Sequence, residues 1–188
     1  KTGAPVAIGR GIVHVQATFK RLLGLDDAFD GDGAPFDRLL DDGERLPLGT
    51  LEVQVLATPG HTSDSLSYRV GDAVFIGDTL FSPAAGSARC DFPGGDAVAL
   101  YASVHRLYAL PPETRLFLCH DYPPAGVEPR ACVPLTEEMR ANIHLAASVD
   151  EADFLAMRTQ RDATLAVPRL LWPALQVNIR AGRLPPAD

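Results

Sequence analysis

Cysteine is scarce in this chain, and its three copies, Cys90, Cys119 and Cys132, form no CxxC pair. An odd number of cysteines leaves at least one unpaired, which argues against a disulfide framework. It suits a reducing compartment instead. We therefore expect a cytoplasmic location.

Basic residues are also few, because 17 Lys and Arg stand against 24 Asp and Glu, for a net charge of −7. Nucleic-acid binders need clustered Lys and Arg for phosphate contacts, so this balance argues against that class. No run of like charges is long enough to act as a tail, and no apolar run reaches the length of a membrane helix. We find no signal-peptide pattern at Lys1, no internal repeat and no low-complexity segment.

Hydrophobic residues make up 46% of the 188 residues, enough for the core of one domain. Short apolar runs predict early strands, followed by a strand–helix–strand unit and then by helices. This order favours an α/β or α+β layered sandwich. The expected strands cover residues 6–8, 51–57, 65–70, 73–76 and 115–118. Residues 36–40 fit either a short strand or a turn of helix. The expected helices cover residues 97–109, residues 136–145 and a segment capped by Asp150.

Three chemically similar positions follow three of these strands. His61 comes directly after an apolar run that stops at Pro59-Gly60, and Asp78 follows a second run that stops at Gly77. His120 follows the run from Arg115 to Cys119. Imidazole and carboxylate groups bind divalent metals, so strand ends at one edge of a sheet would form a metal site.

Each of these assignments has a plainer alternative. Asp78 could instead cap the next segment by accepting from the amides of Leu80 or Phe81. Strand alternation puts Cys119 and His120 on opposite faces, so we expect only one of them, His120, to enter the site.

The two residues beyond His120, Asp121 and Tyr122, are the candidate catalytic residues. Asp121 suits a position behind the metal, orienting an imidazole or a loop amide. Tyr122 could direct its hydroxyl into the site or pack against it. In the loop expected from Ser82 to Gly95, Arg89 forms an internal ion pair with Asp91 or contacts substrate. Two histidines and a carboxylate suit iron in oxygen chemistry or zinc in hydrolysis, and spacing alone does not choose.

The combined motifs resemble the metallo-β-lactamase superfamily. They are Thr58-Pro-Gly-His61-Thr62, Gly77-Asp78-Thr79-Leu80-Phe81 and Cys119-His120-Asp121-Tyr122. The segments Ala88-Arg89-Cys90-Asp91-Phe92 and Gly94-Gly95-Asp96 look most like its persulfide dioxygenase branch, the ethylmalonic-encephalopathy-protein-like enzymes. Glyoxalase II enzymes share the first two motifs but usually have a Glu where Asp121 stands.

The resemblance implies a four-layer αββα fold and a mononuclear non-haem Fe(II) that oxidises glutathione persulfide to sulfite with O2. His61 and Asp78 then match two iron ligands, His120 lies near the iron, and Tyr122 lies beside metal and substrate. The branch often carries an extra basic residue that meets glutathione. The positions nearby are Arg140 and His144, and we expect them, with Arg89, to contact substrate.

One departure from the family is large. The signature His-x-His-x-Asp-His, which supplies the remaining iron ligand, is absent from residues 1–188, and His14 does not replace it. We therefore expect a single domain over 1–188 that represents the C-terminal two-thirds of such an enzyme, incomplete at its N-terminus and with little activity alone. Two alternatives remain, a zinc-dependent thioester or lactone hydrolase of the glyoxalase II kind and a catalytically silent domain. We expect no nucleic-acid or membrane partner and leave a homodimer open.

Overall fold

The computed structural model describes residues 2–123 and 125–186, which form two sheets and five helices. The strands are β1 (Ala7–Gly9), β2 (Arg38–Leu40), β3 (Arg45–Leu48), β4 (Leu51–Ala57), β5 (Leu66–Val70), β6 (Ala73–Phe75), β7 (Arg115–Phe117) and β8 (Cys132–Pro134). The helices are α1 (Ile12–Leu23), α2 (Ala97–Tyr108), α3 (Leu135–Ala141), α4 (Glu151–Asp162) and α5 (Leu171–Asn178). No helix in this described part is both long and apolar enough to cross a membrane.

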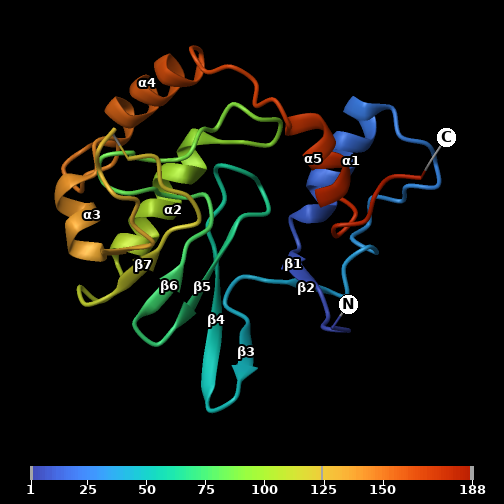
Figure 1. The fold of residues 1–188 in the computed structure, drawn as a ribbon, viewed down its shortest axis with the longest axis horizontal. Coiled ribbons are helices and arrows are strands. Elements are labelled where there is room, and N and C mark those ends of the chain that lie inside the picture. The colour runs from blue at the N-terminus through green and yellow to red at the C-terminus, as the bar shows by residue number, and fades with distance from the viewer. Residues whose placement is uncertain (1, 124, 187–188) are drawn as a thin grey trace.

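The larger sheet has six strands in the order β3-β4-β5-β6-β7-β8. Its neighbours are antiparallel except for β6 and β7, which run parallel and are joined by a crossover that contains α2 (Figure 1). Strands β5 and β6 form a hairpin with Gly71-Asp72 at its turn, and Val70 pairs with Ala73. Since β4 and β6 both run opposite to β5, the strands β4, β6 and β7 all point the same way.

Helices α2, α3 and α4 lie beside this sheet and close its main core (Figure 1). The apolar stripe of α2 is fully buried at Leu100, Val104 and Leu107, and each such side chain contributes about 2 kcal/mol of hydrophobic stabilisation. The helix starts as predicted at Asp96, whose Oδ1 accepts from the amide of Val98 at 2.8 Å.

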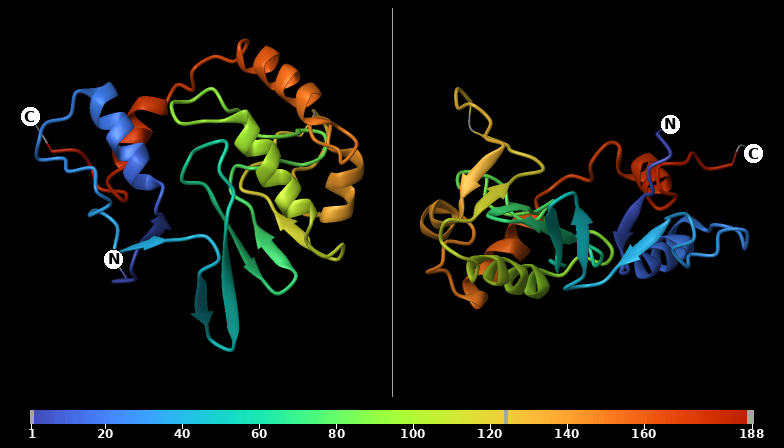
Figure 2. Two further views of the ribbon diagram at one scale, coloured as in Figure 1. Left: turned by 180° about the vertical axis from the view of Figure 1, so that it is seen from behind. Right: turned by 90° about the horizontal axis from the view of Figure 1, so that it is seen from below.

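A second group of elements lies at the other end of the molecule, where β1 and β2 pair in parallel and α1 lies beside α5 (Figure 2). Buried Gln16 joins the two helices by donating to the carbonyl of Ile179 at 2.8 Å. This group meets the larger sheet through Gly9, where a Cβ would come within 2.5 Å of the Asp64 carbonyl. The two sheets with their helices form an α+β sandwich, which confirms the fold class expected from the sequence.

The structure differs from the expected elements in several places, and it contains two further helices, α1 and α5. Strands β3 and β8 were not expected, because β3 contains Pro47 and β8 ends at Pro134. The helix expected over 136–145 is shorter and ends at Asn142, whose Oδ1 accepts from two following amides. That side chain offers the backbone a turn in place of further helix. The ambiguous segment 36–40 forms strand β2.

Candidate metal centre

The three candidate metal ligands follow β4, β6 and β7, the strands that run in the same direction. Their carboxyl ends therefore reach one edge of the larger sheet. His61 lies with Nε2 3.9 Å from Oδ2 of Asp78, and His120 lies with Nε2 3.6 Å from Oδ1 of the same carboxylate. The structure thus brings together the three residues singled out in the sequence, with Asp78 between two imidazoles.

The Asp78 carboxylate has the bonding expected of a cation ligand. Its Oδ1 atom is buried, and no hydrogen-bond donor within the described residues reaches it. The alternative role as a helix-type cap is not seen, because the amide of Phe81 donates to the Gly86 carbonyl instead. A buried carboxylate oxygen without a partner is costly, and a divalent cation held between Asp78 and the imidazoles would satisfy it. The residues present therefore fit a metal ion.

His61 is oriented by a hydrogen bond from its other ring nitrogen. Nδ1 lies 2.8 Å from the carbonyl oxygen of Arg89, and a carbonyl can only accept, so Nδ1 carries the proton. The neutral ring then has its lone pair on Nε2, the atom that faces Asp78. Metal-binding histidines commonly have this arrangement.

Cys119 lies in the same cluster, which corrects one prediction from the sequence. Its sulfur, a carboxylate oxygen of Asp78 and a ring nitrogen of His120 all lie within 4.8 Å of one another. The alternation of faces expected for Cys119 and His120 holds only inside a strand, and β7 already ends at Phe117. Burial and then the charge of Asp78 raise the pKa of the Cys119 thiol.

The two residues after His120 lie differently from each other. Tyr122 is 63% exposed at the mouth of the site, where its ring meets Phe81 edge-on at 5.2 Å. Asp121 instead turns away to accept from the Arg130 amide at 2.8 Å, so it fastens the loop after the site. Burial acts to raise the pKa of Asp121, but hydrogen bonds, including that amide, lower it overall.

A cavity of about 490 Å³ opens beside the candidate metal ligands. Arg89 contributes to its wall, but its guanidinium is engaged with both carboxylate oxygens of Asp91, at 2.6 and 2.5 Å, and with the Ala166 carbonyl. The internal ion pair considered from the sequence is therefore present. Arg161 of α4 also lines the cavity, and within the described chain its guanidinium forms no ion pair or hydrogen bond.

The other two substrate candidates lie outside the lining of this cavity. Arg140 is exposed near the end of α3. His144 is 6% exposed, and its Nδ1 accepts from the Ser87 amide at 2.8 Å. Burial and then the nearby charge of Arg158 lower the pKa of His144 to about 4, so the ring is neutral near pH 7.

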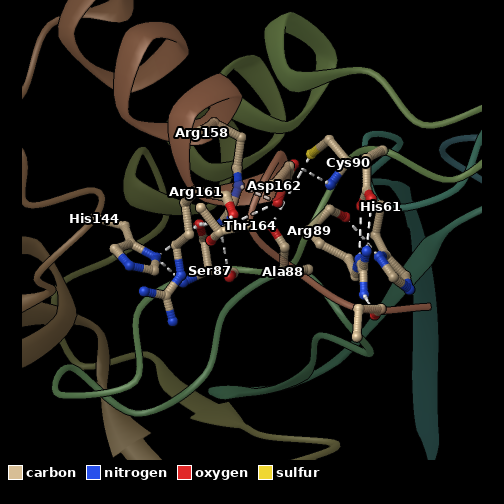
Figure 3. A network of polar contacts seen from close by, with 12 residues as sticks. His61, Ser87, Ala88, Arg89, Cys90, His144, Arg158, Arg161, Asp162 and Thr164 are labelled. Atoms are coloured by element: carbon tan, nitrogen blue, oxygen red, sulfur yellow. Dashed lines mark hydrogen bonds and ion pairs between the residues drawn. The ribbon is translucent and has the colours of Figure 1, made fainter. Parts of the chain in front are cut away.

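Sequence reasoning missed a buried ion pair on α4, between Arg158 and Asp162, that lies behind the loop of Arg89 (Figure 3). Its side chains are 2% and 9% exposed. A signal was available, because these residues lie four apart on the helix face that carries the buried Phe154. Charged residues on a buried helix face need partners.

Comparison with known proteins identifies similar chains. The family model of the Metallo-beta-lactamase superfamily matches residues 2–120. A probable metallo-hydrolase of Burkholderia pseudomallei is 49% identical over 98% of this chain and 66% of its own length. Glyoxylase B2 of Dictyostelium discoideum is 46% identical over 98% of this chain and 64% of its own length.

Among solved structures, the crystal structure of ETHE1 from Myxococcus xanthus superposes with a TM-score of 0.70 at 37% identity, covering 79% of this chain and 62% of that chain. This match confirms the metallo-β-lactamase-like fold that the motifs predicted. The chain spans just under two thirds of the length of the two curated relatives that it matches.

Proposed function

The chain belongs to the metallo-beta-lactamase superfamily, and on that premise we propose that it carries the catalytic centre of a persulfide dioxygenase. The reaction is RSSH + O2 + H2O → RSH + SO3²⁻ + 2 H⁺, in which the outer sulfur is oxidised and O2 is reduced. The similarity to the Myxococcus xanthus ETHE1 structure and the loop motif around Arg89 support this branch of the family.

The proposal depends on one observation. The Asp78 carboxylate, whose Oδ1 atom is buried and has no hydrogen-bond donor in the described chain, lies between the Nε2 atoms of His61 and His120. His61 and Asp78 would hold a single Fe(II), and His120, 3.6 Å from the same carboxylate, would lie beside it. Two histidines and one carboxylate are the ligand set of non-haem iron oxygenases, in which the iron brings O2 and substrate together for oxidation. Within this site, Asp78 supplies the negative charge and the imidazoles supply neutral nitrogen donors.

The substrate would be the persulfide of a small anionic thiol of the glutathione kind. The cavity beside the ligands has room for such a molecule. Arg161 on its wall offers an unpaired guanidinium for a carboxylate, and Tyr122 stands at its mouth with an exposed hydroxyl. Arg89, already paired with Asp91, would shape the wall and orient His61 through its carbonyl rather than bind substrate by charge.

The experiment uses the full-length protein loaded anaerobically with iron. Addition of glutathione persulfide and air should give oxygen uptake and one sulfite per O2, and zinc-loaded protein should give neither. Absence of uptake with stoichiometric iron bound would contradict the proposal.

A zinc-dependent thioester hydrolase is the second candidate, and the position of Cys119 favours it. The cluster of Asp78, Cys119 and His120 offers oxygen, sulfur and nitrogen donors that suit zinc, beside the nitrogen of His61. The relative named glyoxylase B2 adds support. Two zinc ions per chain and release of thiol from a glutathione thioester would favour this candidate over the oxygenase. Failure of both reactions with both metals would leave a catalytically silent domain.

A further inference from the structure

A single peptide unit, between Arg89 and Cys90, lies between His61 and a buried carboxylate on α4 (Figure 3). Its carbonyl oxygen accepts from Nδ1 of His61 at 2.8 Å. Its N–H, which is that of Cys90, donates to Oδ2 of Asp162 at 2.9 Å. The described chain contains no cis peptide bond, and in a trans peptide the N–H and C=O groups point in opposite directions. Asp162 and His61 are therefore joined through one peptide plane.

Asp162 is itself held in a fixed position. Its Oδ1 accepts from Nε of Arg158 at 3.0 Å and from Nη2 at 2.6 Å. The same guanidinium donates through Nη1 to the carbonyls of Ser87 and Ala88, each at 3.2 Å. The ion pair thus fixes the carbonyls of Ser87 and Ala88 through Arg158, and it fixes the N–H of Cys90 through Asp162.

Loop anchoring alone does not account for the buried carboxylate. Removing a charge pair from water is costly, and well-packed apolar residues often stabilise a fold equally well. The Arg89 side chain also anchors the same loop, through Asp91 and the Ala166 carbonyl. What Asp162 adds is a negative charge at the N–H end of the peptide. Such a charge polarises the peptide and makes its carbonyl oxygen a stronger acceptor.

We propose that Asp162 is a positioning residue for His61, acting through the Arg89–Cys90 peptide. The polarised carbonyl keeps the imidazole proton on Nδ1 and holds the ring so that the Nε2 lone pair faces Asp78. The arrangement corresponds to a carboxylate–histidine–metal triad with a peptide inserted between carboxylate and histidine. This inference rests on the assignment of His61 as a metal ligand in the proposed function.

The test has a readout that needs no metal and no turnover. In metal-free full-length protein, long-range ¹H–¹⁵N spectra report which nitrogen of His61 carries the proton. Wild type should show one tautomer, with the proton on Nδ1. The variant Asp162→Asn should show a mixture of tautomers. Its Fe(II) affinity, measured by anaerobic competition with a chelator, should fall 10- to 100-fold, the usual range for loss of a group behind a metal ligand.

Asp91→Asn is the matched control, because it breaks another ion pair of the same loop without touching the bonds of the peptide. It should keep the single tautomer and an affinity close to wild type. If Asp91→Asn and Asp162→Asn alter the tautomer and the affinity equally, the loop needs only general anchoring and the proposal is overturned.

A second variant covers the case in which Asp162→Asn leaves Arg158 as an unpaired buried charge and does not fold. The double variant Arg158→Gln/Asp162→Asn is neutral and keeps hydrogen-bonding groups at both positions. A folded double variant that retains a single Nδ1–H tautomer and wild-type Fe(II) affinity would overturn the proposal.

The variant His61→Ala tests the assignment of His61 as a metal ligand separately from the role of Asp162. If it leaves metal binding unchanged, the proposed metal centre fails, whereas the tautomer result still decides the role of Asp162.

Discussion

Oδ1 of Asp78 lies 3.6 Å from Nε2 of His120, yet it is buried without a hydrogen-bond donor anywhere in the described chain. Carboxylates that stabilise a fold usually accept hydrogen bonds from amides or pair with Arg, as Asp72 does with Arg115. The bonding of Asp78 therefore suits a residue that binds a cation better than one that stabilises the fold. Substitution can separate these two roles.

Asp78→Asn should abolish metal binding and turnover while leaving the fold nearly unchanged. The amide keeps the shape of the carboxylate but loses the charge that balances a divalent ion. Thermal melts of the metal-free wild type and variant should nearly coincide, whereas iron content after desalting should collapse. Asp72→Asn, an exposed paired carboxylate away from the site, serves as control and should keep its metal. A variant that retains iron and rate would make Asp78 structural and Asp121 the next carboxylate to test.

Arg161→Ala should lower kcat/KM for an anionic persulfide by about 10- to 100-fold, through KM, because a charge-assisted hydrogen bond contributes roughly 1.5–3 kcal/mol. Arg140→Ala is the control, since it removes the same charge from a position outside the cavity lining. Steady-state kinetics with a charged and an uncharged persulfide would measure both. Equal effects of the two substitutions would mean that the overall charge of the protein attracts the substrate, without a direct contact from Arg161.

Gly86→Ala should lower the free energy of unfolding by more than about 2 kcal/mol. A Cβ at Gly86 would lie 2.1 Å from Nδ1 of His144, and the backbone there has φ +89°. Gly71→Ala is a matched control with φ +60° and no atom within 4 Å, so it carries only the backbone cost of about 1 kcal/mol. Denaturant titration would give the loss in free energy of unfolding for each variant. The difference between the two losses is the steric cost of placing a Cβ against His144. Equal losses would contradict the close packing of His144 on this loop.

His144 by itself should lower stability as the pH falls into the mildly acidic range. Its folded pKa of about 4 lies below its ordinary value of 6.5, so the unfolded chain binds more protons between these pH values and unfolding becomes easier as pH decreases. The effect should reach on the order of 3 kcal/mol at pH 4. Burial raises the pKa of Glu138 to about 7, and its contribution has the opposite slope, since it is lost as pH rises.

The variant His144→Asn isolates the histidine, because its side-chain oxygen can still accept from the Ser87 amide. The free energy of unfolding of the variant should therefore rise relative to that of the wild type when the pH is lowered from 7 to 4. Denaturant titrations at both pH values would measure this, and a constant difference would show that His144 titrates normally in the folded state.

Much of the candidate site could be predicted from the sequence, because its ligands depend on local patterns. An apolar run that stops at Gly60 or Gly77 places the next residue at a strand end, and β4, β6 and β7 were expected nearly where they lie. The end of β7 was the weak point, since one residue of fraying brought Cys119 into the cluster against expectation. Assignment of the roles of these residues remains a prediction.

Most features that escaped the sequence depend on contacts between distant segments. Strand β8 pairs with β7 across a long loop that no local pattern specifies. Strand β3 is the exception, because it pairs with β4 across the two-residue turn Gly49-Thr50, and it was missed because Pro47 argued against a strand. The burial of His144 and of the Arg158–Asp162 pair follows from the loop around Ser87 folding over them. Sequence spacing could suggest a charged pair on α4, but it could not say which peptide that pair would bind.

The hydrogen bond from Cys90 to Asp162 spans 72 residues, and that from Arg89 to Ala166 spans 77. A growing chain that has just emerged past His120 therefore contains His61, Asp78 and His120 and lacks the helix that fixes the loop beside His61. Synthesis proceeds at about 5–20 residues per second, so α4 follows only seconds later. During that interval the ligands would meet metal ions on a loosely held loop. A nascent chain paused there should bind metal weakly, and the affinity should rise once α4 has docked.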